Sequence, residues 1–183
     1  ILVMGLETRD LDRVAYKELR ARIGYVIGDS TLLSIHSGLV NVMLPALYHY
    51  PEKSFSTVSM YARTLLKELE CDFDAQLMPH NMTSFQQRQI QLARALILEP
   101  DILFMEDPFY DLAIDDKRAF AQNIIKMRGR VHSNCVILTT DFLDFVKRYV
   151  DRLIFVGSCS VEVFPDWEKF SASRKPEIER YLD

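Results

Sequence analysis

The sequence predicts an α/β fold in which crossover helices connect the strands of a parallel β-sheet. Helical segments alternate with short apolar segments, and this alternation is typical of parallel strands joined by helices. The chain has 183 residues, of which 49% are hydrophobic. That is enough to bury the core of one ordinary domain. No repeats or low-complexity tracts interrupt the sequence, so we predict a single domain over residues 1–183.

The individual elements are predicted from periodicity and from residues that begin or end helices. Apolar side chains recur every three or four residues in the longer segments, as in amphipathic helices. Pro100 ends one such helix, and Asp115 and Asp116 favour the first turn of another. Helices are predicted over residues 15–22, 54–70, 83–98, 115–128 and 141–149, with two short ones around Pro176. Strands are predicted over residues 23–27, 101–105, 135–140 and 152–156.

Charge and composition exclude several classes of protein. The formal charge is −4, and no dense run of Lys or Arg supplies the footprint of a nucleic-acid binder. Cys71, Cys135 and Cys159 are far apart and form no CxxC motif, so we expect buried, reduced thiols in a cytosolic protein. No apolar run reaches the roughly 18 residues that a transmembrane helix needs. We expect no membrane span and no nucleic-acid partner.

Two adjacent carboxylates, Glu106 and Asp107, directly follow the apolar run Ile102–Met105. In a parallel α/β sheet, ligands gather at the carboxyl ends of the strands, where an acid can hold a metal or polarise a water. The alternative is that the pair caps a turn before Pro108 and faces solvent. The pair alone favours the second interpretation, so the surrounding sequence has to decide.

That surrounding sequence is distinctive. Residues 77–109, LMPHNMTSFQQRQIQLARALILEPDILFMEDPF, resemble the signature helix and Walker B strand of the ATP-binding subunits of ABC transporters. KELRARIGYV (17–26) is similar to the strand that enters the family's Q-loop, and LLSIHSGLVNVMLPALYH (32–49) to its permease-docking segment. CVILTTDFLDFVKRYVDRLIFV (135–156) is similar to its switch strand and the helix that follows. The resemblance covers nearly all of residues 1–165, in the family's order.

The resemblance implies a P-loop NTPase-like parallel sheet with a helical subdomain. The helical subdomain and signature helix would occupy about residues 39–95, the core sheet 100–165 and a helical tail 166–183. The family's phosphate loop, GxxxxGK[ST], is missing, because none of the six glycines is followed by Lys. The chain starts at Ile1 rather than Met, and ILVMGLE resembles the family just downstream of that loop. We therefore expect an ABC-ATPase-like domain without its N-terminal portion, through truncation or through loss of nucleotide binding.

The resemblance also implies roles for individual residues. Glu106 corresponds to the Walker B acid that reaches magnesium, and Asp107 to the glutamate that polarises the attacking water, so the family's Asp-Glu order is inverted. The three signature positions, Thr83, Ser84 and Gln86, would contact nucleotide bound to a partner subunit. Thr140 corresponds to the switch histidine and completes the predicted site.

Several positions depart from the family's pattern. Gly28 replaces the Q-loop glutamine, and Ala113 replaces the D-loop aspartate, although Asp111 or Asp115 could compensate. Ser84 and Phe85 replace two signature glycines, and a side chain obstructs the approach of backbone N–H groups to a phosphate. Asp107 is also one methylene shorter than the expected glutamate. Together these changes predict absent or very slow ATP hydrolysis by this chain.

Two hypotheses follow. In the first, the chain is a degenerate ATP-binding-subunit-like component of an ABC transporter, with ATP and magnesium as cofactors. Its partners would be a transmembrane permease and a second ATPase domain, in a homo- or heterodimer on the inner face of a membrane. In the second, the chain is a non-catalytic interaction or regulatory module. The aromatic group Tyr48, His49, Tyr50 and Phe55 is predicted either as an exposed docking patch or as core, and the four histidines show no metal-ligand spacing.

Overall fold

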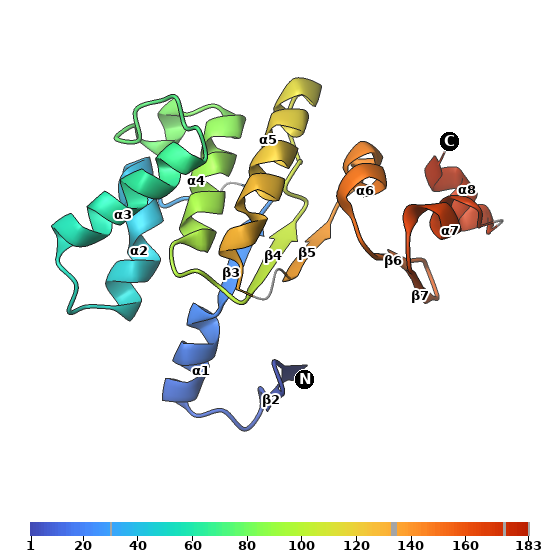
Figure 1. Cartoon of the computed structure of the whole chain (residues 1–183), viewed down its shortest axis with the longest axis horizontal. Coiled ribbons are helices and arrows are strands. Elements are labelled where there is room, and N and C mark those ends of the chain that lie inside the picture. Colours follow the sequence, from blue (N-terminus) through green and yellow to red (C-terminus); the bar gives the residue numbers. More distant parts are fainter. Residues whose placement is uncertain (30, 133–134, 174, 183) are drawn as a thin grey trace. The chain divides into compact units, whose positions relative to one another are not determined.

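The computed structural model describes residues 1–29, 31–132, 135–173 and 175–182, which form two compact units (Figure 1). The first unit comprises Ile1–Thr140 and the second Asp141–Asp183. None of the described helices is long and apolar enough to cross a membrane.

A three-stranded parallel sheet organises the first unit, in the order β3 (Ile23–Ile27), β4 (Ile102–Glu106) and β5 (Cys135–Thr139). Ile27 is paired with Glu106, and Glu106 with Thr139. The carboxyl ends of the three strands are therefore level with one another. The prediction of parallel strands joined by helices is confirmed for this sheet.

Four of the helices described in the first unit lie close to their predicted ranges, whereas the helix over residues 38–49 was not predicted from the pattern. The helices of this unit are α1 (Arg13–Ala21), α2 (Gly38–His49), α3 (Phe55–Glu68), α4 (Ser84–Leu96) and α5 (Ile114–Met127), with 3₁₀ turns η1 (Pro79–Asn81) and η2 (Arg128–Arg130) and a small hairpin of β1 (Leu2–Val3) and β2 (Leu6–Glu7). In Figure 1, α4 has α2 and α3 on one side and α5 and the sheet on the other. It contacts all three helices and β3, and it is buried around most of its circumference.

Polar side chains fix α4 within this apolar surrounding. Gln89 is 3% exposed and donates to the Leu69 carbonyl at 3.2 Å and to Asn123 Oδ1 at 3.3 Å. Asn123 on α5 donates to the same Leu69 carbonyl at 3.2 Å. A buried amide is costly without partners, so these bonds allow only orientations of α4 that keep Gln89 facing α5 and the end of α3.

The second unit contains α6 (Leu143–Tyr149), the antiparallel strands β6 (Leu153–Val156) and β7 (Val161–Phe164), α7 (Trp167–Ser171) and α8 (Pro176–Leu182). Its core gathers Val146, Leu153, Phe170 and Ile178. The two short tail helices are confirmed. The alternation pattern was misleading for residues 152–156: in the described chain, β6 pairs with β7 and does not join the parallel sheet.

The three thiols are free, but the prediction that all are buried is wrong. Cys159 is exposed, because it lies in the turn between β6 and β7, whereas Cys71 and Cys135 are partly buried. Burial, with a smaller contribution from Asp72, raises the pKa of Cys71 to about 12.

Candidate functional site

The carboxyl edge of the parallel sheet brings several predicted site residues together. Glu106 ends β4 and Asp107 follows it, and Thr140 directly follows β5. Because the strand ends are level, these three residues belong to one edge. Gly28, directly after β3, belongs to the same edge.

Glu106 is exposed, and its carboxylate has a partner that the sequence did not reveal. The Tyr25 hydroxyl on the neighbouring strand donates to Glu106 Oε2 at 2.9 Å. This hydrogen bond, followed by burial and the charge of Glu106, raises the pKa of Tyr25, since only the neutral phenol can donate. Tyr25 therefore holds the Glu106 carboxylate at the strand end.

Asp107 makes the turn that leaves β4. Its φ of 41° lies in the left-handed region, which Asp tolerates better than most residues. Its backbone N–H faces Thr139, 3.2 Å from the carbonyl oxygen and 3.1 Å from Oγ1. The Thr139 hydroxyl in turn lies 3.5 Å from Asp107 Oδ1. The second carboxylate is therefore oriented toward β5 by its own turn.

Gly28 lies tightly against this turn. A Cβ atom at position 28 would lie 2.6 Å from the Asp107 carbonyl oxygen and 3.1 Å from the Tyr110 Cβ. The first contact is with backbone, which cannot rotate away as a side chain can. The position therefore lacks both a glutamine and the space for one while the turn keeps this conformation.

Arg88, on α4, connects the end of β3 to the turn after β4. It is 4% exposed, and its guanidinium donates to the carbonyls of Ile27 at 2.7 Å, Tyr110 at 3.1 Å and Gly28. Burial lowers the pKa of Arg88, and the charges of Asp29 and Asp111 partly offset this. Nε has no hydrogen-bond partner within the described chain. Arg88 thus ties the end of β3 to the turn after β4, two segments that are far apart in the sequence.

The predicted signature residues form the N-terminus of α4. Thr83 is its N-cap: its hydroxyl accepts from the Gln86 N–H at 3.2 Å, while Gln86 Oε1 accepts from the Thr83 N–H at 3.0 Å. This is a capping box, which satisfies two N–H groups of the first turn. Ser84 Oγ lies 3.5 Å from Asp111 Oδ2 in the turn after β4. The first turn of α4 therefore touches the acidic turn, but Thr83 and Gln86 are engaged with each other.

Thr140 and Ala113 are the remaining residues discussed from the sequence. Thr140 is partly exposed. Ala113 is the N-cap of α5 and provides no side-chain cap. Tyr25, Arg88 and Thr139 were not identified from the sequence, and nothing in the local pattern around these residues marks them.

The arrangement fits a magnesium ion better than a protein-only metal site. No cluster of three or more His, Cys, Asp or Glu that could hold a metal occurs among the described residues. Mg²⁺, however, commonly takes one or two carboxylates and completes its shell with waters and substrate phosphates. Glu106, exposed at the strand end, can supply such a carboxylate, and a bound magnesium would polarise phosphate oxygens there.

Comparison with known proteins gives this edge its context. No family model matches the chain. The choline transport ATP-binding protein OpuBA of Bacillus subtilis is 28% identical over 200 residues, which cover 98% of this chain and 51% of OpuBA. The lipoprotein-releasing system ATP-binding protein LolD of Bacteroides fragilis is 27% identical over 157 residues, covering 83% of this chain and 70% of LolD. The homologues of the present chain are ATP-binding proteins of ABC transporters.

Solved ABC cassettes share the fold. The dimeric cassette MJ0796 bound to ADP and Pi superposes with a TM-score of 0.75 at 24% identity, over 87% of this chain and 71% of that cassette. CbiO1 of Clostridium perfringens superposes with a TM-score of 0.78 at 20% identity, over 93% of this chain and 67% of its own. The chain has the fold of an ABC ATPase domain and covers most of it. It spans only about half the length of OpuBA (51%) and of the MetN protein of Clostridium tetani (57%).

Proposed function

We propose that this chain is a single ABC-ATPase-like domain that couples ATP binding to a membrane permease and hydrolyses ATP slowly or not at all. The observation that carries the proposal is the pair of carboxylates at the end of β4, held at the edge where Thr140 and the first turn of α4 also lie. Glu106 would hold magnesium, Asp107 would position the attacking water, and Thr140 would stand in the switch position. Thr83, Ser84 and Gln86 would face the γ-phosphate of nucleotide bound to a partner subunit.

Slow hydrolysis is supported by the geometry around Asp107. Its carboxylate is shorter than that of glutamate and faces Thr139. A misplacement of a catalytic group by about 1 Å can cost on the order of a hundredfold in rate. Gly28 leaves no glutamine to contact the metal, and the nearby Asp107 carbonyl leaves no room for one.

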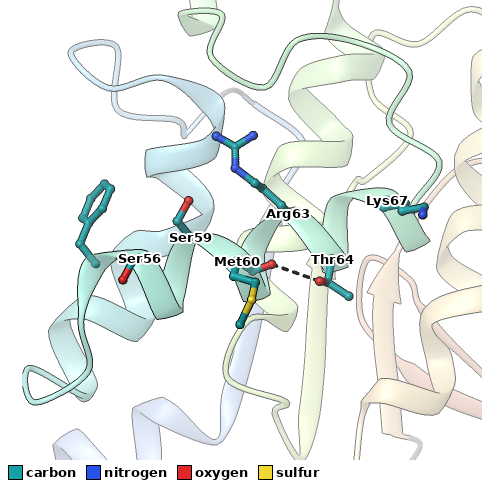
Figure 2. A pocket seen from close by; sticks show the side chains of 7 residues that line it. Ser56, Ser59, Met60, Arg63, Thr64 and Lys67 are labelled. Atoms are coloured by element: carbon teal, nitrogen blue, oxygen red, sulfur yellow. Dashed lines mark hydrogen bonds between the residues drawn. The ribbon is translucent and has the colours of Figure 1, made fainter.

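Association with a permease is supported by exposed apolar side chains on α3. Phe55 and Met60 are 59% and 66% exposed. They line a shallow hollow of about 510 Å³ together with Arg63 and four further α3 residues (Figure 2). Tyr48 is 62% and Tyr50 37% exposed, which favours the docking-patch alternative for this aromatic group. Such patches mark protein interaction sites, and we propose that the chain binds there to a permease at the inner, cytoplasmic face of a membrane.

The second candidate is a non-catalytic module that keeps the scaffold and its docking surface. The closed space at Gly28 and the capping box of Thr83 and Gln86 favour it, because both use the nucleotide-facing positions for structure. In that case a partner ATPase domain would provide the only competent site of a dimer.

Calorimetry and turnover measurements distinguish the two. Purified chain is titrated with ATP and ADP, with and without magnesium, and ATP turnover is measured for the unmodified chain, Asp107→Asn and the control Asp144→Asn. Asp144 is an exposed carboxylate on α6 that has no place in the predicted site. Magnesium-dependent binding that Glu106→Gln weakens, with little turnover, supports the proposal. Robust turnover that only Asp107→Asn abolishes contradicts slow hydrolysis, and no binding at millimolar nucleotide favours the non-catalytic module.

A further inference from the structure

One face of α1 is cationic and unpaired. Arg13, Lys17 and Arg20 follow one another at intervals of four and three residues, so they lie on the same side of the helix. Within the described residues, none of the three has a carboxylate at ion-pair distance, although Arg22, just beyond the helix, pairs with Asp101 at 2.5 Å. In a chain whose formal charge is −4, this face is a local exception.

Aromatic side chains border the same face. Lys17 Nζ lies 4.8 Å from the centre of the Tyr48 ring, within the range of a cation–π interaction. Tyr48 is 62% exposed and packs edge-on against His49, with ring centres 5.0 Å apart. Tyr16 on α1 is 49% exposed. We define the α1 patch as Arg13, Tyr16, Lys17, Arg20, Tyr48 and His49.

Two cations of the α1 patch act on His49. Burial lowers the pKa of His49, and the charges of Lys17 and Arg20 lower it further. A ligand at this patch therefore meets a positive field and exposed aromatic rings together.

We propose that the α1 patch binds the anionic headgroups of a phospholipid surface. The cations are spread along about 10 Å of helix, given the rise of about 1.5 Å per residue, and two of them are exposed without a fixed partner. Such an arrangement suits a diffuse negative surface better than a single recognised charge. Tyr rings beside the cations also suit the headgroup region, where an apolar ring and a polar hydroxyl are both accommodated. This goes beyond the proposed function, which requires only a permease and brings the chain near a membrane.

Sedimentation with lipid vesicles tests the proposal without nucleotide or permease. The chain is mixed with vesicles of phosphatidylglycerol and phosphatidylcholine, or of phosphatidylcholine alone, at low and high salt. We expect binding only to the anionic vesicles at low salt. Each cation near an anionic surface contributes about fivefold to partitioning, so the triple variant Arg13→Gln, Lys17→Gln, Arg20→Gln should bind about 100-fold more weakly.

A matched control removes three exposed cations from other elements: Arg118→Gln, Lys147→Gln and Arg152→Gln. It has the same net charge as the triple variant and should bind almost as well as the unmodified chain. Circular dichroism checks that both variants are folded. Equal losses in the two variants, or no binding of the unmodified chain to anionic vesicles, overturn the proposal. If polyglutamate saturates the α1 patch and the vesicles do not bind, the patch is assigned to an acidic protein segment instead.

Discussion

The substitution Gly28→Ala tests the closed turn directly. The added Cβ would meet the Asp107 carbonyl at 2.6 Å, and relief requires the turn after β4 to move. That turn is held on one side by Thr139, which binds the Asp107 N–H, and on the other by Arg88, which binds the Tyr110 carbonyl. Overpacking costs about 1–3 kcal/mol, and a strained hydrogen bond adds up to about 1 kcal/mol. We expect a loss of about 2–3 kcal/mol in the free energy of unfolding.

The control for this loss is Gly129→Ala. A Cβ atom at Gly129 would meet nothing within 4 Å, and neither glycine has a positive φ. The two substitutions therefore change the unfolded chain alike and differ in the native contact. Gly129→Ala should be neutral or stabilise by up to about 1 kcal/mol. Urea unfolding followed by circular dichroism measures both.

If Gly28→Ala unfolds at the same urea concentration as Gly129→Ala, the turn does not close over position 28 and the reasoning is refuted. Gly28→Gln extends the test to function. Because the space is closed, restoring the family's glutamine should destabilise the chain at least as much as alanine and should not improve nucleotide binding. A gain in magnesium-dependent ATP affinity would show that the turn opens readily.

Four further predictions concern this edge and the helices that begin beside it. Arg88→Met should destabilise the chain by about 2–4 kcal/mol, because buried carbonyls lose their donor, and hydrogen exchange should accelerate in the turn after β4. Thr83→Ala should cost about 1 kcal/mol by removing the cap of α4, whereas Ala113→Ser should stabilise α5 by about 0.5–1 kcal/mol, as thermal unfolding will show. The raised pKa of Tyr25 means that its contribution is fully present below pH 10 and is lost as pH rises through the folded value. Ultraviolet titration should show it ionising at lower pH in Glu106→Gln; an unchanged titration would contradict the hydrogen bond.

The sequence predicted the features that depend on local pattern. Periodicity and helix-starting residues located the helices other than α2, and the parallel arrangement placed Glu106 and Thr140 at one edge of the sheet. Thr83 and Gln86 also carried a readable local signal, since Thr-x-x-Gln before an apolar helix is a capping box. The resemblance drew attention to nucleotide contacts at these positions instead.

The sequence pattern could not predict contacts between segments that are distant in the chain. Arg88 reaches the carbonyls of Ile27 and Tyr110, and nothing in the residues near α4 identifies those partners. The conformation of Asp107, with its positive φ, depends on Thr139 in a strand that follows much later. The antiparallel pairing of β6 with β7 was not predicted for a different reason: an alternation of helices and strands does not specify which sheet a strand joins.

The polar bonds of Gln89 to Leu69 and Asn123 have a consequence for how this chain tolerates change. Replacing Gln89 and Asn123 together by apolar residues of similar size removes two paired amides, but the Leu69 carbonyl, which accepts from both, loses both donors. Other polar bonds still hold α4 in its rotational setting, among them the bond from Arg88 to the Ile27 carbonyl. The double change should therefore lower the melting temperature and leave the edge of the sheet in place.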